Sequence, residues 1–321
     1  MKQNLKENKE EKMTEAYIID AARTPRGIGK LGKGSLSEFH PGRLLATVLE
    51  EIQKRNDLVT QDIDDVVIGC SSQVGKQGSC VGRMAALDAG WDTSASAVTL
   101  DRFCGSGITS VNLAAANIMS GMDDLCVAGG VEMMSYTATL TSERNNRTVD
   151  GGNLHLREIH PQPHQGICAD LIATLEGFSR EELDALAVES QNRAQQAIAE
   201  GRFDRSLITV RNEDGSIALD REEFPRPGTT LDTLASLPTV FSEFMPTPVD
   251  DGGETFTELV ARRYPDLEIN HVHHAGNSSG VVDGAAALVL SSKDYADKAG
   301  WKPRARIKAM ATVGGDPTFC L

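Results

Sequence analysis

One cysteine of this sequence lies where an apolar strand passes into a helix. The run from Ala97 to Leu100 predicts a buried strand, and apolar residues at three- and four-residue steps from Ile108 predict a helix that begins just after Cys104. The positive end of a helix favours the thiolate form of a nearby cysteine, and the thiolate is the nucleophile. An arbitrary free cysteine is more often an inert core residue. The Gly-Ser-Gly that follows Cys104 allows close approach of a substrate and favours the nucleophilic interpretation.

Composition excludes several classes of protein. The chain has 321 residues, which allow one or two domains with a large core. Its formal net charge of -14 argues against a nucleic-acid partner, since nucleic-acid-binding surfaces are basic. No apolar run reaches the length of a membrane span, so we expect no membrane partner.

The N-terminal residues and the cysteines indicate the cellular compartment. Residues 1–13 are polar and rich in Lys and Glu, which predicts a disordered tail and neither a secretion signal nor a transit peptide. The 6 cysteines show no disulfide framework and no CxxC spacing. A reducing cytoplasm is therefore the expected location.

Strand and helix patterns alternate along much of the chain. Apolar runs predict strands at 16–20, 66–69, 97–100, 125–128 and 285–290, and periodic patterns predict helices at 41–52, 82–89 and from about 106 to 120. This alternation predicts an α/β fold with a buried sheet covered by helices. Residues near 145–269 are more polar and predict an insertion, with a long helix opened by a capping box at Ser179. Residues 304–312 predict the start of another strand.

Other local patterns leave their alternatives open. The small-residue segment Ala275–Gly280 suits the wall of a narrow ligand site and suits a plain loop equally well. A zinc site is one interpretation of three nearby histidines, His271, His273 and His274. The local sequence fixes no carboxylate or thiolate partner for them, so we predict no metal. Arg226, held between two prolines, suits a phosphate contact or a solvated loop charge. The GxGxxG, Walker A and GxSxG motifs are all absent, and we expect no bound cofactor.

Several segments together resemble the thiolases, the group of acetyl-CoA acetyltransferases and 3-ketoacyl-CoA thiolases. The segments that carry the resemblance are spread over essentially everything after residue 13. They are 16–25, 101–107 around Cys104, 129–135, 166–170, the helix after Ser179, and 275–290.

The resemblance implies a layered α/β fold made of two similar halves, with a loop domain inserted in the first half. Residues 14–145 and 270–293 then correspond to the first half, residues 146–269 to the coenzyme A-binding loop domain, and residues 294–321 to the start of a second half that is largely absent.

The resemblance also implies a function. Cys104 corresponds to the nucleophile that carries the acyl group as a thioester, in thiolytic cleavage of 3-ketoacyl-CoA or in condensation of two acetyl-CoA. Coenzyme A thioesters are then the substrates, and fatty acid metabolism and a homo-oligomer, if the protein is complete, are further expectations. The family's coenzyme A contacts correspond to six residues: His164, Arg226, Thr233, Phe241, Ala275 and Ser279.

The sequence departs from the family in its catalytic second half. The family motifs Asn-Glu-Ala-Phe, Gly-His-Pro and Cys-x-Gly-Gly do not occur in these 321 residues, and Cys320 has no such glycine-rich context. In the family they supply an asparagine, the histidine that activates the nucleophile, and an acid/base cysteine. We therefore expect impaired turnover from this chain alone. The alternative from a different class is a non-catalytic coenzyme A-binding or assembly subunit that needs a partner chain.

Overall fold

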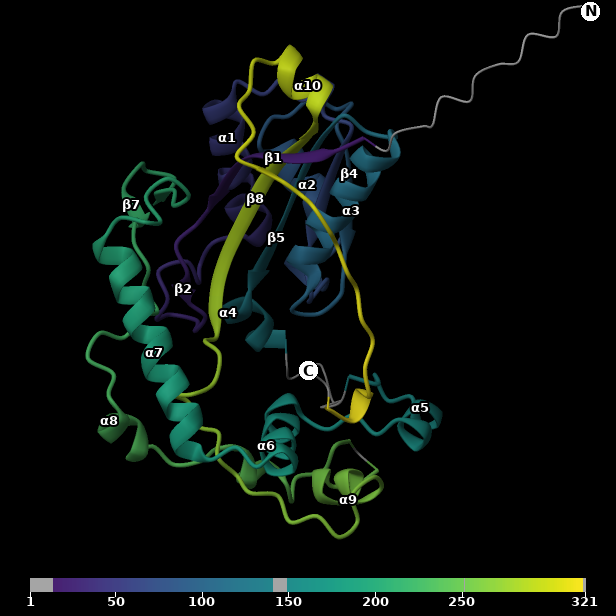
Figure 1. Ribbon diagram of the computed structural model, residues 1–321, viewed down its shortest axis with the longest axis vertical. Coiled ribbons are helices and arrows are strands. Elements are labelled where there is room, and N and C mark those ends of the chain that lie inside the picture. Colours follow the sequence, from purple (N-terminus) through teal and green to yellow (C-terminus); the bar gives the residue numbers. More distant parts are fainter. Residues whose placement is uncertain (1–13, 141–148, 251, 320–321) are drawn as a thin grey trace, which may run out of the picture. The chain divides into compact units, whose positions relative to one another are not determined.

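The computed structural model describes residues 14–140, 149–250 and 252–319 (Figure 1). The expected tail at residues 1–13 and Cys320 lie outside the described residues. Two compact units are present. We call residues 14–134, 205–223 and 282–311 the sheet unit, and residues 135–204, 224–281 and 312–319 the second unit.

The sheet unit contains most of the strands and the helices that cover them. Its strands are β1 (Ala16–Arg23), β2 (Gly27–Ile28), β3 (Asp65–Gly69), β4 (Ser96–Leu100), β5 (Leu125–Met133), β8 (Val282–Ser292) and β9 (Ala305–Arg306), with a separate hairpin of β6 (Val210–Arg211) and β7 (Ile217–Leu219). Its helices are α1 (Pro41–Asn56), α2 (Val81–Asp88), α3 (Ser106–Ser120) and α10 (Lys293–Lys298), with single turns at η1 (Thr60–Asp62) and η2 (Gly75–Gln77).

The central sheet is mixed, with the order β4-β3-β5-β8-β1-β9 and β2 paired to β8. β3 runs parallel to both β4 and β5, where Val67 lies opposite Val98 and Ala128. β8 runs antiparallel to both β5 and β1. The carboxyl ends of three parallel strands therefore lie along one edge of the sheet.

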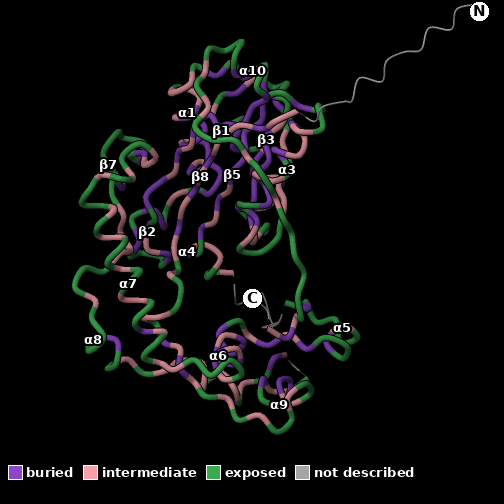
Figure 2. The backbone as a smooth tube through the Cα atoms, viewed as in Figure 1, coloured by how far each residue is buried: buried purple, intermediate pink, exposed green. Residues whose placement is uncertain are grey.

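Helices cover both faces of the sheet, because side chains alternate along each strand. Val67 of β3 packs in one apolar cluster with Ala115 and Ile118 of α3. The next residue, Ile68, faces α2 so closely that a Cβ on Gly82 would lie 2.8 Å from its Cγ1. α1 packs against α2 and β8. Figure 2 shows the resulting concentration of buried residues on β3, β5 and β8.

β4 differs from the expectation of a buried strand. It pairs only with β3, at the end of the sheet, and the side chain of Val98 is 43% exposed. A short apolar run does not separate a central strand from an edge strand. The expected strand at 304–312 is likewise reduced to the two residues of β9.

One segment of the expected loop domain packs with the sheet unit. The backbone of Arg23 in β1 donates to the carbonyl of Ser206 at 2.8 Å and accepts from the amide of Ile208 at 3.0 Å. The carboxylate of Glu222 pairs with both Arg23 and Arg26. Residues 205–223 are therefore fixed to β1 and its following turn.

The second unit is mainly helical. Its elements are α5 (Leu154–Ile159), α6 (Gln165–Glu176), α7 (Arg180–Ala199), α8 (Leu231–Ala235), α9 (Phe256–Ala261), η3 (Ala138–Leu140), η4 (Phe241–Phe244) and η5 (Pro317–Phe319). α4 (Met134–Thr137) begins in the sheet unit and continues into the second unit. Ser179 and Glu182 form the predicted capping box of α7. Ile167 of α6 and Phe256 of α9 belong to its core.

Among the residues that the structure describes, none of the helices combines the length and the apolar character that a bilayer crossing requires.

Candidate active site

Cys104 lies in the turn between β4 and α3. β4 ends at Leu100, Gly105 is the N-cap of α3, and the Cys104 side chain is exposed. The turn is tight, because Phe103 has a φ of 47° in the left-handed region that residues other than glycine rarely adopt. The sulfur is therefore presented to solvent beside a helix N-terminus, as the sequence predicts, and not buried in the core.

Ser106 closes this turn by bonding to the two residues before the cysteine. Its Oγ accepts from the amide of Arg102 at 2.8 Å and donates to the carbonyl of Phe103 at 2.6 Å. The carboxylate of Asp101 accepts from the amide of Phe103 at 2.7 Å. These bonds satisfy backbone groups of the turn and fix the conformation that exposes the sulfur.

Glycines bring the first turn of α3 against the sheet. A Cβ on Gly69, the last residue of β3, would lie 2.5 Å from the carbonyl carbon of Ser106. A Cβ on Gly130 would lie 2.9 Å from the carbonyl oxygen of Gly69. Ser110 Oγ donates to the carbonyl of Gly129 at 2.7 Å. The Cys104 turn is thus seated at the carboxyl ends of the parallel strands, where α/β sheets commonly bind ligands.

The other described cysteines have different surroundings. Cys70, Cys126 and Cys168 are buried, and Cys80 is half-buried. Burial, aided by the Glu132 carboxylate, raises the pKa of Cys70 to about 12. Such a thiol stays protonated and unreactive at neutral pH. Of the described cysteines, Cys104 therefore has the exposure that a nucleophile needs.

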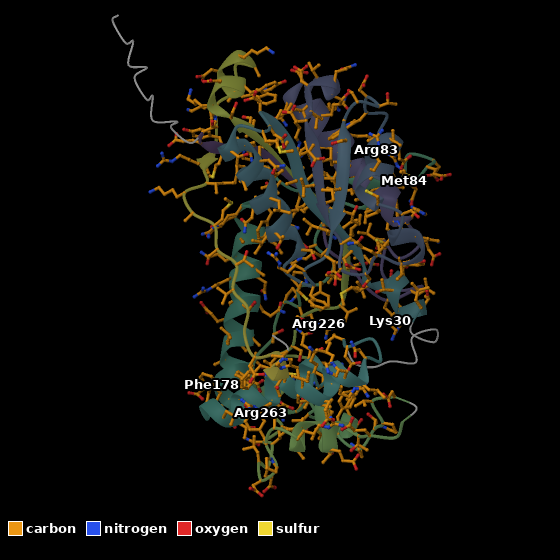
Figure 3. The ribbon with its side chains drawn as sticks, turned by 90° about the vertical axis from the view of Figure 1, so that its right-hand side faces the viewer. Lys30, Arg83, Met84, Phe178, Arg226 and Arg263 are labelled. Atoms are coloured by element: carbon orange, nitrogen blue, oxygen red, sulfur yellow. The ribbon has the colours of Figure 1, made fainter. Side chains whose placement is uncertain are left out.

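The six predicted coenzyme A contacts all lie in the second unit. Arg226 is exposed (Figure 3). Its Cζ lies 5.9 Å from the centroid of the Phe224 ring. That ring packs on the small-residue segment, since a Cβ on Gly280 would lie 2.5 Å from Phe224 Cε1. Ser279, the residue before Gly280, is exposed as well. The structure thus brings Arg226 and Ser279 into one neighbourhood.

Thr233 and Ala275 meet in a similar way. A Cβ on Gly276, next to Ala275, would lie 2.5 Å from Leu234 Cδ2 of α8. Thr233 and Ala275 are both exposed, on the two segments that this contact joins. The Thr233 hydroxyl also has a structural role, because it accepts from the amide of Thr230 at 2.9 Å in the capping box of α8.

His164 and Phe241 form an aromatic cluster with Phe244. The His164 ring centroid lies 5.7 Å from that of Phe241 and 5.1 Å from that of Phe244. His164 Nδ1 accepts from the amide of Gly166 at 3.1 Å and so caps α6. Burial lowers the pKa of His164, which favours the neutral ring that can accept this bond.

Comparisons with known proteins identify the family to which this chain belongs. A family model described as "Thiolase, N-terminal domain" matches residues 16–247. A beta-ketoadipyl-CoA thiolase of Escherichia coli is 36% identical over 322 residues, which cover 95% of this chain and 73% of that protein. The chain belongs to the thiolase family.

Further relatives and a solved structure support this assignment. A 3-ketoacyl-CoA thiolase of Bacillus subtilis is 35% identical, covering 95% of this chain and 72% of that protein. The crystal structure of the Bacillus anthracis acetyl-CoA acetyltransferase matches with a TM-score of 0.70 and 27% identity, covering 92% of this chain and 69% of that one. The predicted thiolase-like α/β fold is confirmed.

In this thiolase the histidines at 271 and 273 are oriented by a carboxylate. Their Nδ1 atoms lie 2.7 and 2.6 Å from the two oxygens of buried Asp170 in α6. Burial alone would raise the pKa of Asp170, but hydrogen bonds from His273, His271 and two backbone amides hold it below its usual range. No group of three or more metal-ligating side chains occurs within the described part of the chain.

Sequence reasoning missed the buried acids of this thiolase. Asp170 and Asp184 hold the segment that contains His271, His273 and His274, yet each lies about 90 to 100 positions before its partners. For Asp184 the available signal was an aspartate in the interior of the helix expected after Ser179, because acids are seldom fully buried without a partner. Asp170 lies in no helix that the sequence predicted.

Proposed function

We propose that this thiolase is an acyltransferase in which Cys104 takes the acyl group of an acyl-CoA as a thioester. The observation that carries the proposal is the exposed sulfur at the N-terminus of α3, in a turn closed by Ser106. A helix N-terminus stabilises negative charge that develops near it, so this position suits a nucleophilic sulfur.

The acylation step is a thioester exchange. The Cys104 thiolate attacks the carbonyl carbon of the acyl-CoA, and the carbon–sulfur bond to coenzyme A breaks as the tetrahedral intermediate collapses. Coenzyme A leaves as a thiolate and takes a proton from solvent. The acyl group then remains on Cys104, so the transfer is divided into two easier steps.

The second unit supplies the coenzyme A contacts in this proposal. Arg226 is exposed and suits a phosphate, since a guanidinium pairs with two phosphate oxygens at once. His164 and Phe241 present an apolar ring surface suited to the less polar part of the ligand. The relatives' names, 3-ketoacyl-CoA thiolase and acetyl-CoA acetyltransferase, support coenzyme A thioesters as substrates. Fatty acid metabolism, a homo-oligomer and a cytoplasmic location stay predictions.

A complete catalytic cycle needs acid and base groups in addition to the nucleophile. The Gly-His-Pro and Cys-x-Gly-Gly motifs do not occur in these 321 residues. A positioned general base contributes roughly 10²–10⁴-fold. We therefore propose that the 321-residue chain performs the acylation step and its reversal, and turns over slowly in thiolysis of acetoacetyl-CoA.

Exchange of labelled coenzyme A into unlabelled acetyl-CoA tests this directly. Exchange requires only that Cys104 takes the acetyl group and returns it to coenzyme A. We expect exchange by the unaltered chain, its loss in Cys104→Ala, and its retention in the matched control Cys80→Ala. Equal exchange by Cys104→Ala and the unaltered chain would contradict the proposal.

A further inference from the structure

A buried aspartate of the second unit connects the segments that bear the predicted coenzyme A contacts. Asp184 lies within α7 and is 3% exposed. Its Oδ1 accepts from Nε2 of His274 at 2.8 Å and from Nδ2 of Asn277 at 3.0 Å. Both donors lie in the segment that contains Ala275 and Ser279.

His274 and Asn277 are in turn bonded to the backbone of that segment. Nδ1 of buried His274 accepts from the amide of Gly276 at 3.1 Å, so Nε2 carries the proton that is donated to Asp184. Oδ1 of Asn277 accepts from the amide of His274 at 2.8 Å, and Ser278 Oγ donates to the carbonyl of His274 at 2.8 Å. The turn 274–278 is therefore bonded internally and held at Asp184.

The same aspartate faces the helix that contains Thr233. The Arg180 Nε lies 3.6 Å from Asp184 Oδ2. Nη2 of Arg180 donates to the carbonyls of Leu234 at 2.9 Å and of Leu237 at 2.6 Å, at the end of α8. The guanidinium thus adds hydrogen bonds at the end of α8, where the carbonyl of Leu234 also accepts from the amide of Leu237 at 3.0 Å.

We propose that Asp184 is a positioning residue for coenzyme A binding, which holds the 274–278 turn directly and α8 through Arg180. This inference rests on the proposed function, because it assigns Ala275, Ser279 and Thr233 to the coenzyme A contacts. Preorganised binding segments lose less entropy when the ligand binds. Removal of the carboxylate leaves the Nε2 donor of His274 without its acceptor and the Arg180 guanidinium without the negative charge that faces it, so the two segments lose the side chain that connects them.

Two pairs of variants separate positioning from general stability. Asp184→Asn keeps an acceptor oxygen for His274, whereas Asp184→Ala removes it. His274→Gln keeps a donor near the position of Nε2, whereas His274→Asn keeps only an acceptor near the position of Nδ1. Glu189→Gln, an exposed position on α7, is the matched control.

The readouts are coenzyme A affinity by titration calorimetry and the acylation rate of Cys104 with a short thioester that lacks the nucleotide. For Asp184→Ala we expect the dissociation constant for coenzyme A to rise about tenfold or more, since a buried hydrogen bond to a charged group is lost. The short thioester should acylate Cys104 at an unchanged rate. Asp184→Asn and His274→Gln should retain most of the affinity, and His274→Asn should lose it.

The outcomes are distinguishable from failure of the proposed function. If the unaltered chain is not acylated at Cys104 by either donor, the proposed function fails. If acylation occurs but Asp184→Ala binds coenzyme A as the unaltered chain does, the positioning role is wrong. An equal fall in the rates with both donors would also overturn it, because that pattern indicates a loss of folded protein.

Discussion

The Oγ of Ser106 donates a hydrogen bond of 2.6 Å to the carbonyl of Phe103, the residue just before the candidate nucleophile. Phe103 has a φ of 47°, so its conformation persists only if neighbouring contacts hold it. The same oxygen accepts from the amide of Arg102 at 2.8 Å. One buried hydroxyl therefore fixes the backbone on which the sulfur of Cys104 is presented.

Substitution of this hydroxyl tests that role. Ser106→Ala leaves the amide of Arg102 without its side-chain acceptor, which is expected to cost about 1–3 kcal/mol of unfolding free energy. Acylation of Cys104 by acetyl-CoA should also slow, because the strained turn loses its fixed conformation. Urea unfolding measures the change in stability, and mass spectrometry of samples quenched at successive times measures the acylation rate. Ser120→Ala, at the exposed end of the same helix, should change neither; an equal effect of both variants would contradict this role.

The contact between Gly69 and α3 predicts a position-specific cost. In Gly69→Ala the new methyl would lie 2.5 Å from a backbone atom of Ser106, so α3 must move away from the sheet. Overpacking of this kind costs about 1–3 kcal/mol. The matched control is Gly107→Ala, where a Cβ meets nothing within 4 Å and should stabilise the helix by up to about 1 kcal/mol. Denaturant midpoints that move in the same direction for both would refute the account.

His164 predicts a dependence of stability on pH. Burial lowers its pKa in the folded chain below the ordinary value of 6.5, so the unfolded chain binds a proton that the folded chain does not. The folded state should therefore lose stability as pH falls below about 6.5. His164→Asn removes the titrating ring and keeps an N-cap acceptor for α6. Urea midpoints at neutral and mildly acidic pH should fall further for the unaltered chain than for the variant; parallel falls would rule out this cause.

Local patterns in the sequence predicted the elements near the site well. The helix over Pro41–Asn56 begins at a proline after His40 and buries Leu44, Val48 and Ile52 on one face, as expected. α3 ends at Ser120, as the pattern predicts, and Gly121 follows it in the left-handed conformation that glycine adopts readily. These features depend on residues within one or two helical turns, so the local sequence is enough to predict them.

Features that depend on distant partners were not predictable in the same way. The apolar run around Val98 predicts a core residue. Its strand, however, has a neighbouring strand on one side only, and Val98 is exposed. Glu222 belongs to a polar stretch, and nothing local indicates its pairing with Arg23 and Arg26. The approach of His273 to Asp170 spans 103 positions. Each of these needs the tertiary fold before it can be recognised.

The proposed acyl transfer depends most directly on the sulfur of Cys104. Incubation with acetyl-CoA, followed by proteolysis and tandem mass spectrometry, locates any acetyl group on the chain. We predict a single acetyl increment on the peptide that contains Cys104, absent in Cys104→Ala and retained in Cys80→Ala. An increment that survives in Cys104→Ala, or no increment in the unaltered chain, would contradict the assignment of Cys104 as the nucleophile.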